Sequence, residues 1–440
     1  MKKWISFGTL VLFFSISTLA ENYYIDSEAG NDAHAGTSPE YAWKTVNKVN
    51  RFTYQPGDVI HFHAGQAWRE SLICQSGTEN NPLTYTNYGE GEKPLFVASI
   101  DVCHEKYWVY KGDNIWSVLP GYFSTGKSPH YLNIGNIILN KIAETDKKAA
   151  WKRWSLEELK SQGDFYHDTG NDLLYFYSDK NPGLVYSGME AAMQRNIFNL
   201  DKCNYTIIDG LAAAYTGAHG ANGAQTRHCT IRNCDFFWIG GSYLYTRNEK
   251  PVRYGNGVQF WNGAEDNLVE NNYFEQIYDV AMTNQGPEAC LVKNIIWRKN
   301  KIYHCEQAHE IWLSSREAQM QNVVFEGNEC IGSGFGWSHE QRPDKKGTHL
   351  LAYLMEAKEF DIHYRDNVFI NAADAMIWFL NPRLPEAHLD NNIYIQNTDD
   401  CDKLPMFRWG NTHVAWEEYR KITGHDKNSV YKCEQIEKIE

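Results

Sequence analysis

The segment Val269-Glu270-Asn271-Asn272-Tyr273-Phe274 contains the pattern that decides the fold. It has an apolar residue, an asparagine three positions later, and a second apolar residue two positions after that. The pattern recurs at residues 297–302, 325–330, 364–369 and 389–394. An earlier copy at residues 231–236 has Cys234 in the asparagine position. Such a period indicates a solenoid, in which each repeat adds one layer to a continuous core.

The asparagines of the five copies explain how such layers would stack. They are separated by 28, 28, 39 and 25 residues. A coil with short strands and tight corners needs a left-handed or bent backbone at each corner, which asparagine tolerates. Asparagines at one corner of successive coils could also satisfy one another's amides. The sequence therefore predicts an all-β, right-handed parallel β-helix and disfavours an antiparallel sandwich, which would need no such asparagine.

The longest interval predicts an insertion, which we place at residues 338–350. Insertions in solenoids usually mark the functional face. Short alternating apolar segments such as 206–208, 258–260 and 377–379 predict strands. Helical periodicity is confined to residues 42–52 and 151–160.

The first residues predict export from the cytoplasm. Lys2 and Lys3 precede a short apolar run, and Thr18-Leu19-Ala20 fits a cleavage site. No later segment reaches the roughly 18 apolar residues that a membrane span needs. We therefore expect a cleaved signal peptide, a periplasmic or extracellular location, no membrane span and a monomer.

Charge and cysteine content restrict the partners. The formal net charge of −13 argues against nucleic acid, because an acidic surface repels phosphate. Uronic or sulfated polymers remain possible partners, since a local basic groove can lie on an acidic protein.

The ten cysteines lack both a compact disulfide spacing and a C-x₂-C zinc pattern. We expect mostly buried free thiols.

Several motifs resemble bacterial secreted right-handed parallel β-helix proteins related to pectate lyases and β-helix glycoside hydrolases. They are Tyr23-Tyr24-Ile25-Asp26, Gly30-Asn31-Asp32, Gly36-Thr37-Ser38-Pro39, Ala42-Trp43-Lys44-Thr45, Pro56-Gly57-Asp58 and Thr423-Gly424-His425-Asp426. The resemblance covers nearly the whole mature chain and implies a helix from Ala42 capping the open end. Together with the leader and the break in the coil repeat, it predicts a signal peptide (1–20), cap and first coils (21–102), β-rich insert (103–190), main β-helix (191–400) and C-terminal cap (401–440).

The resemblance also indicates a catalytic pair. Related proteins have Tyr-Asp before a Thr-Asn-Gln-Gly-type turn, as at Asp279, and an acid before an aromatic strand on the next coil, as at Glu310. Glycoside hydrolysis uses two carboxyl groups, one protonated and one ionised. His309 could orient Glu310, although neighbours on a strand point to opposite faces. With a 28-residue coil, Glu310 aligns three positions beyond Asp279, which leaves retaining and inverting mechanisms both open.

Other residues of the same coils are candidates for binding a polysaccharide or oligosaccharide. Aromatic side chains near strand ends can stack on a sugar ring, and polar side chains can orient it. These candidates are Trp261, Gln285, Trp312, Arg316, Trp337, His339 and Arg342.

Two other functions remain open. A polysaccharide lyase would remove the proton beside a uronate carboxyl, with Arg253, Lys293, Arg298, Arg316, His339 or Arg342 contributing. A non-catalytic β-helix would bind a glycan without cleaving it. We expect no metal or other cofactor, except Ca²⁺ if the reaction is elimination, for instance at Glu265 and Asp266. A metal site of His304, Glu306 and His309 is a weaker alternative.

Overall fold

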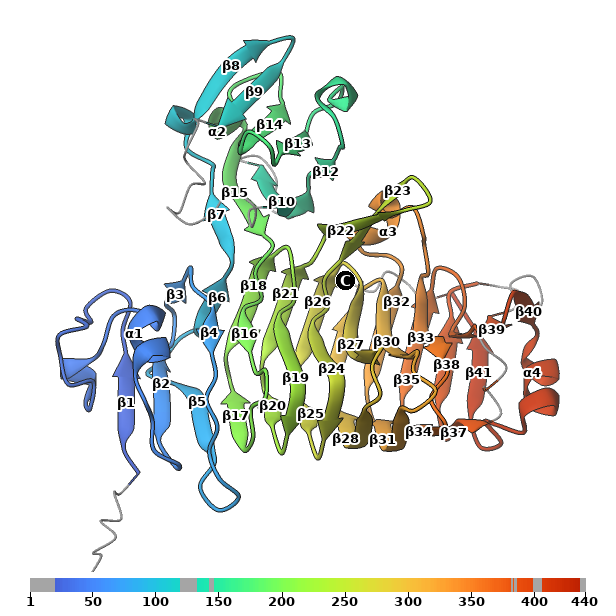
Figure 1. Cartoon of the computed structure of the whole chain (residues 1–440). Helices are drawn as coiled ribbons and strands as arrows, with labels where there is room; N and C mark the ends of the chain where they lie inside the picture. The colour runs from blue at the N-terminus through green and yellow to red at the C-terminus, as the bar shows by residue number, and fades with distance from the viewer. Residues whose placement is uncertain are drawn as a thin grey trace, which may run out of the picture.

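The computed structural model describes residues 20–118, 133–141, 146–380, 383, 386–398 and 406–435. These residues form a parallel β-helix, with a separate β-rich unit projecting from its N-terminal half (Figure 1). The predicted leader, apart from Ala20, and Cys401 lie outside the described residues. Across the part of the chain that is described, no helix is both long and apolar enough to cross a membrane.

One wall of the β-helix is a ten-stranded sheet in which all neighbouring strands are parallel. Its strands are β3 (Ala67–Trp68), β6 (Leu95–Val97), β18 (Ala212–Thr216), β21 (Asp235–Ile239), β26 (Tyr273–Ile277), β29 (Lys301–Tyr303), β32 (Glu329–Ser333), β35 (Val368–Ala372), β38 (Ile393–Gln396) and β41 (Val430–Cys433). Each strand belongs to a different coil, so neighbours in space are far apart in sequence. The predicted parallel β-helix is confirmed.

The rest of the wall is a 20-stranded sheet, to which most coils contribute two strands. The first strands of the central coils are β24 (Val258–Glu265), β27 (Val280–Gly286), β30 (Gln307–Leu313), β33 (Thr348–Met355) and β36 (Ile377–Phe379). The second strands are β25 (Leu268–Glu270), β28 (Leu291–Arg298), β31 (Gln319–Glu326), β34 (Glu359–Arg365) and β37 (His388–Asp390). Backbone pairing fixes the register between consecutive coils.

The predicted asparagine ladder is confirmed at the corner between the two sheets. The Nδ2 atom of each of Asn272, Asn300, Asn328 and Asn367 donates to the Oδ1 atom of the next ladder asparagine at 3.0 to 3.1 Å. The same Oδ1 atoms accept the backbone N–H of the preceding asparagine. These side chains are buried, so every amide is satisfied inside the protein.

We expected the ladder asparagine itself to adopt the left-handed backbone conformation at this corner. In the structure, the residue before the ladder asparagine adopts it instead. The φ angles are 55° at Asn271, 54° at Lys299, 62° at Gly327, 58° at Asp366 and 59° at Asn391. This turn directs the following asparagine inward, where it bonds the next coil. The conformational and hydrogen-bonding roles therefore fall on two successive residues.

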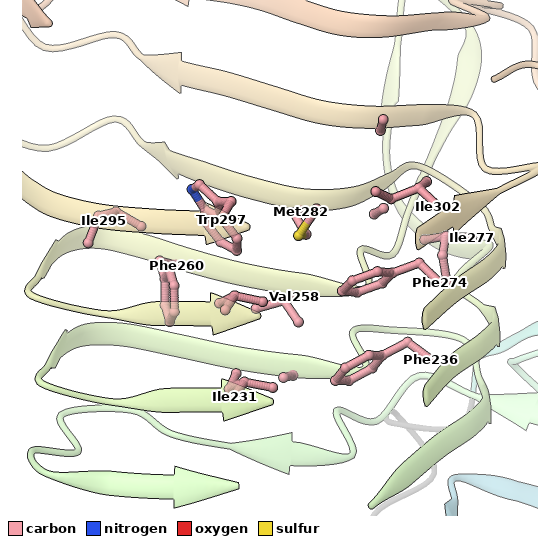
Figure 2. Close-up of a cluster of buried hydrophobic side chains, with 14 of the residues drawn as sticks. Ile231, Phe236, Val258, Phe260, Phe274, Ile277, Met282, Ile295, Trp297 and Ile302 are labelled. Carbon is pink, nitrogen blue, oxygen red and sulfur yellow. The ribbon is translucent and has the colours of Figure 1, made fainter. Parts of the chain in front are cut away.

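Rows of apolar side chains fill the interior (Figure 2). In one row, Phe236 stacks on Phe274 with ring centroids 5.0 Å apart. The same row continues through Ile302 and Cys330, which pair in register between β29 and β32. Among the cysteines that the structure describes, Cys330 is one of eight that are free, and six of these eight are buried, as predicted for thiols that serve as core residues. Cys433 is disulfide-bonded.

The predicted β-rich insert has its own core. Strands β7 (Ser99–Asp101) and β15 (Tyr186–Met193) connect it to the β-helix. Coils on either side of the insert stack directly, because β6 pairs with β18. The helical periodicity of residues 151–160 is misleading, since this segment contains β12 (Trp151–Lys152) and a short 3₁₀ helix, Leu156–Glu158. Tertiary packing of the insert overrides that weak local preference.

Helices lie near both ends of the β-helix (Figure 1). Helix α1 (Val46–Arg51), shorter than the predicted 42–52, buries Val46 and Val49 against the first coils. Helix α4 (Trp416–Thr423) buries Tyr419. The ladder ends nearby at buried Asp426, which accepts hydrogen bonds from Asn392, Tyr394 and Tyr419. The carboxylate therefore satisfies the last amide of the ladder.

Replacing Asn328 by alanine tests the ladder. The variant loses four side-chain hydrogen bonds, to Trp297, to Asn367 and two to Asn300, and leaves buried partners unsatisfied. We expect the free energy of unfolding to fall by about 3 kcal/mol or more in chemical denaturation. The control is Asn47→Ala on the exposed face of α1, which should change it by less than about 0.5 kcal/mol. Equal stability of the two variants would contradict a structural role for the ladder.

Candidate active site

A cavity of about 460 Å³ lies near the beginning of strands β27 and β30. Two insertions help to line it, the hairpin of β22 (Ser242–Arg247) and β23 (Lys250–Tyr254), and the loop 334–347 that contains helix α3 (Trp337–Gln341). The loop corresponds to the insertion predicted at 338–350, because β33 already begins at Thr348. Among the lining residues are Asp279, Glu310, Arg253, Gln307, Arg342, Asp344 and Lys346.

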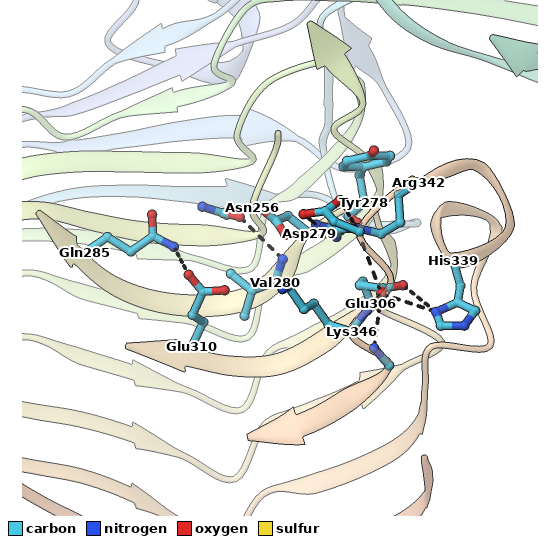
Figure 3. Close-up of polar contacts among 12 residues, drawn as sticks. Asn256, Tyr278, Asp279, Val280, Gln285, Glu306, Glu310, His339, Arg342 and Lys346 are labelled. Atoms are coloured by element: carbon cyan, nitrogen blue, oxygen red, sulfur yellow. Dashed lines mark hydrogen bonds and ion pairs between the residues drawn. The ribbon is translucent and has the colours of Figure 1, made fainter. Parts of the chain in front are cut away.

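The two predicted carboxyl groups face this same cavity (Figure 3). Asp279 lies immediately before β27, and Glu310 lies inside β30. Glu310 pairs in register with Thr283, four positions beyond Asp279 rather than the three expected from a 28-residue coil. The side chains of Asp279 and Glu310 are nevertheless close enough to interact electrostatically, so the charge of Asp279 raises the pKa of Glu310.

Asp279 is held by the loop that contains α3. The Nη1 atom of Arg342 lies 3.0 Å from Asp279 Oδ1 and also donates to the backbone oxygen of Tyr278. Arg342 is nearly buried, whereas the Asp279 side chain keeps 20% of its exposure. Burial raises the pKa of Asp279, and the Arg342 charge opposes this rise. The ion pair therefore favours an ionised carboxylate that remains open to the cavity.

For Glu310, the two largest effects on the pKa act in the same direction. Burial, and then the charge of Asp279, raise the pKa of Glu310 to about 8. The Nε2 atom of Gln285 donates to Glu310 Oε1 at 3.0 Å, which orients the carboxyl group. At neutral pH Glu310 therefore favours its protonated form, next to Asp279, whose pKa burial also raises while the Arg342 charge opposes the rise.

A third carboxylate, Glu306, lies next to the site. It is fully buried and does not line the cavity. Burial alone would raise the pKa of Glu306, but His339, the Arg342 charge and the backbone N–H of Lys346 hold it below its usual value. The Lys346 amide lies 2.6 Å and the Gly347 amide 3.1 Å from Oε1. Glu306 thus anchors the loop that positions Arg342.

Aromatic and guanidinium groups stack behind Asp279. The ring of Tyr278 lies between Arg253, 4.6 Å from its centroid, and Arg342, 5.3 Å from it. Trp337 packs against Tyr278 and lies under Arg253, while its indole N–H donates to the backbone oxygen of Gln276. Trp337, predicted to bind substrate, does not line the cavity and instead packs behind it.

The structure corrects the assignment of His309. Its side chain points into the core, where Nδ1 contacts the hydroxyl group of Tyr364 at 3.1 Å and the ring packs on Phe325. Burial lowers the pKa of His309 to about 3. His309 and Glu310 face opposite sides of β30, so His309 cannot orient Glu310. Within the described residues, His304, Glu306 and His309 do not form a metal-ligand group.

Two other predicted binding residues also lie outside the cavity. The Nδ1 atom of His339 lies 3.1 Å from Glu306, so His339 supports the loop. Arg316 is strongly exposed and lies 3.5 Å from Glu356, beyond the other end of β30. Neither residue lines the cavity, and of the three predicted cationic binding residues, only Arg342 does.

Trp261, Gln285 and Trp312 occupy one register position on three consecutive coils. The two indole rings lie 5.6 Å apart, and Gln285 between them bonds Glu310. Trp261 and Trp312 therefore flank the residue that bonds Glu310, although neither tryptophan lines the cavity itself.

Apart from Arg253 of β23, which was a candidate for elimination, sequence reasoning did not assign the hairpin β22–β23, Gln307 or Lys346 to the site. The hairpin falls between two recognisable repeats, and the long interval between Cys234 and Asn272 is the signal that could have found it. Gln307 and Lys346 have no distinctive sequence motif. They were found only because the register and the α3 loop bring them to the same cavity.

Comparison with known sequences gives short matches. No family model matches the chain. The chain is 32% identical over 84 residues to lacto-N-biosidase of Bifidobacterium longum, covering 18% of this chain and 5% of that protein. It is 32% identical over 62 residues to alpha-1,3-galactosidase A of Akkermansia muciniphila, covering 14% and 10%. The matches thus span at most a tenth of these curated relatives.

Comparison with solved structures covers most of the chain. XylC in complex with xylose superposes with a TM-score of 0.51 at 13% identity, covering 88% of this chain and 69% of that one. The GH136 lacto-N-biosidase of Eubacterium ramulus gives a TM-score of 0.40 at 14% identity, covering 94% and 67%. The likeness to XylC is one of fold, and at that level it confirms the resemblance to pectate-lyase-like β-helix proteins.

Proposed function

We propose that this protein is a glycoside hydrolase in which Glu310 is the general acid and Asp279 the ionised carboxylate. The observation that supports this proposal is the placement of two carboxyl groups in one cavity with different partners, since Asp279 is paired with Arg342 whereas Glu310 is bonded to the neutral amide of Gln285. Glycosidic hydrolysis uses such a pair, because the leaving oxygen needs a proton while positive charge develops on the sugar ring.

Each residue has a chemical role in this proposal. Glu310 donates its proton to the glycosidic oxygen, and Gln285 keeps the carboxyl group oriented. Asp279 supplies the negative charge that the oxocarbenium-like transition state requires. Arg342 holds Asp279 in place, and its charge favours the ionised form of that carboxyl group. The arrangement thus divides acid and anion between two adjacent coils.

The proposed substrate is an oligosaccharide or polysaccharide. Trp261 and Trp312 provide apolar faces beside Gln285, on which a sugar ring can stack. Gln307 lines the cavity, and its buried Oε1 atom has no hydrogen-bond partner among the described residues, which suits a sugar hydroxyl group. The names of the matched relatives, a lacto-N-biosidase and a galactosidase, agree with a glycan substrate. We propose that the protein acts outside the cytoplasm as a monomer.

The lyase alternative has less support from the geometry. Arg253 donates to the backbone oxygens of Gly241 and Gly135, and His339 is bonded to Glu306. Arg298 pairs with Glu270, while Glu265, the candidate Ca²⁺ ligand, pairs with Arg227. The basic groups suggested for elimination are therefore mostly engaged in other contacts.

Substitution of the pair tests the proposal. Once a substrate has been found by screening plant, algal and host glycans for release of reducing ends, Glu310→Gln and Asp279→Asn should each lower kcat/KM by about 100-fold to 10,000-fold. The matched control is Glu317→Gln, an exposed carboxylate on the turn after β30, which should retain wild-type activity.

Other outcomes would separate the alternatives. Near-normal turnover in both variants would overturn the assignment of Asp279 and Glu310. Products that absorb ultraviolet light through a conjugated double bond would identify a lyase. Retention on a glycan column with no product would identify a binding protein.

The pKa of Glu310 predicts the pH dependence. The protonated form is the active acid, so kcat/KM should fall as pH rises through about 8, the pKa of Glu310. The profile should also fall at low pH, where Asp279 becomes protonated. In Glu310→Gln, the residual activity should lack the alkaline decline. If that decline is unchanged in the variant, another group is the acid.

A further inference from the structure

Two histidines and an aspartate gather on the outer surface of the β-helix, on strands β34 and β37. Asp361 and His363 are two positions apart on β34, so both side chains point outward. His388 on the next coil pairs in register with His363. None of the three lines the candidate active site.

The three side chains converge on one point. The Nε2 atom of His363 lies 2.8 Å from Asp361 Oδ1, and that of His388 lies 3.6 Å from the same oxygen. One ligand atom from each residue lies within 4.8 Å of the others. The imidazole rings are stacked, with centroids 4.5 Å apart and an interplanar angle of 19°. The aspartate thus faces two parallel rings that present the same nitrogen atom.

We propose that Asp361, His363 and His388 bind a divalent transition-metal ion of the zinc class. Imidazole nitrogen and carboxylate oxygen are preferred ligands of Zn²⁺, and three protein ligands leave a coordination position open. The other oxygen of Asp361 accepts the backbone N–H of Asn322 at 2.9 Å. This bond fixes the carboxylate while leaving Oδ1 for the metal, a common arrangement around metal ligands.

The surroundings suit a metal with an open position. A cavity of about 300 Å³ borders both histidines and is also lined by Arg365, Asp390 and Lys427. Water can therefore reach the metal.

A bound ion would join two consecutive coils near the C-terminal end. His388 comes from one coil, and Asp361 and His363 come from the coil before it. Within the ranges that the structure describes, no other group of three histidine, cysteine or acidic residues offers such a ligand set. We therefore expect the protein to bind a single ion at this site with high affinity. The bound ion should also make the folded protein more stable.

The experiment is a zinc titration of the full-length, tag-free protein after treatment with a chelator. Calorimetry should show one Zn²⁺ bound per chain. Asp361→Asn and His388→Gln should each weaken binding at least about tenfold, because the loss of even an outer-shell partner costs that much. The matched control is His413→Gln, a histidine 3.7 Å from Asp374 outside the group of three, which should bind zinc as the wild type does.

Thermal unfolding gives a second measurement that does not depend on enzymatic activity. A hundredfold excess of Zn²⁺ over the wild-type Kd should raise the wild-type Tm by about 3 °C, and the rise in each ligand variant at the same zinc concentration should be at most about half as large. The ligand side chains are partly exposed, so both variants should match the wild type without zinc. Absence of a bound ion, or unchanged affinity in both variants, would overturn the site.

Discussion

The asparagine ladder is the interaction on which the rest of this molecule depends. Each ladder amide bonds the asparagine of the next coil, from Asn272 to Asn392. The groups are buried, so losing one contact leaves polar atoms without water or protein partners. The ladder therefore holds successive coils in one alignment at this corner, and Asp426 closes it at the last coil.

Such alignment lets the candidate active-site cavity form from residues far apart in sequence. Asp279 and Glu310 come from consecutive coils, while Arg342 comes from the loop between β32 and β33. The coils position the first two residues, and buried Glu306 positions the loop through the Lys346 and Gly347 amides. The regular coils thus set the register of the two carboxyl groups. The irregular insertions enclose the cavity and provide the positive charge of Arg342.

The features that the sequence predicted are those carried by repetition. The asparagines at a constant phase predicted the coils and their hydrogen bonds, and the long interval before Asn367 predicted the α3 loop. The errors concern features that no repeat carries, namely the segment 151–160 and the direction of single side chains. His309 was assigned to the site although it faces the core, because its strand phase could not be known without the register. The alignment of Glu310 with Thr283 differs by one residue from the average coil length, which only the pairing reveals.

The three acidic residues of the site show why burial alone does not determine protonation. Glu306 is the most buried, yet its pKa is lowered, because two backbone amides and His339 contact its oxygens and Arg342 lies near it. Asp279 has one guanidinium partner, and burial still raises its pKa. Glu310 has only the neutral amide of Gln285, and it faces the charge of Asp279. The charges and hydrogen-bond donors around each carboxyl group, and not burial alone, therefore decide the direction in which its pKa shifts.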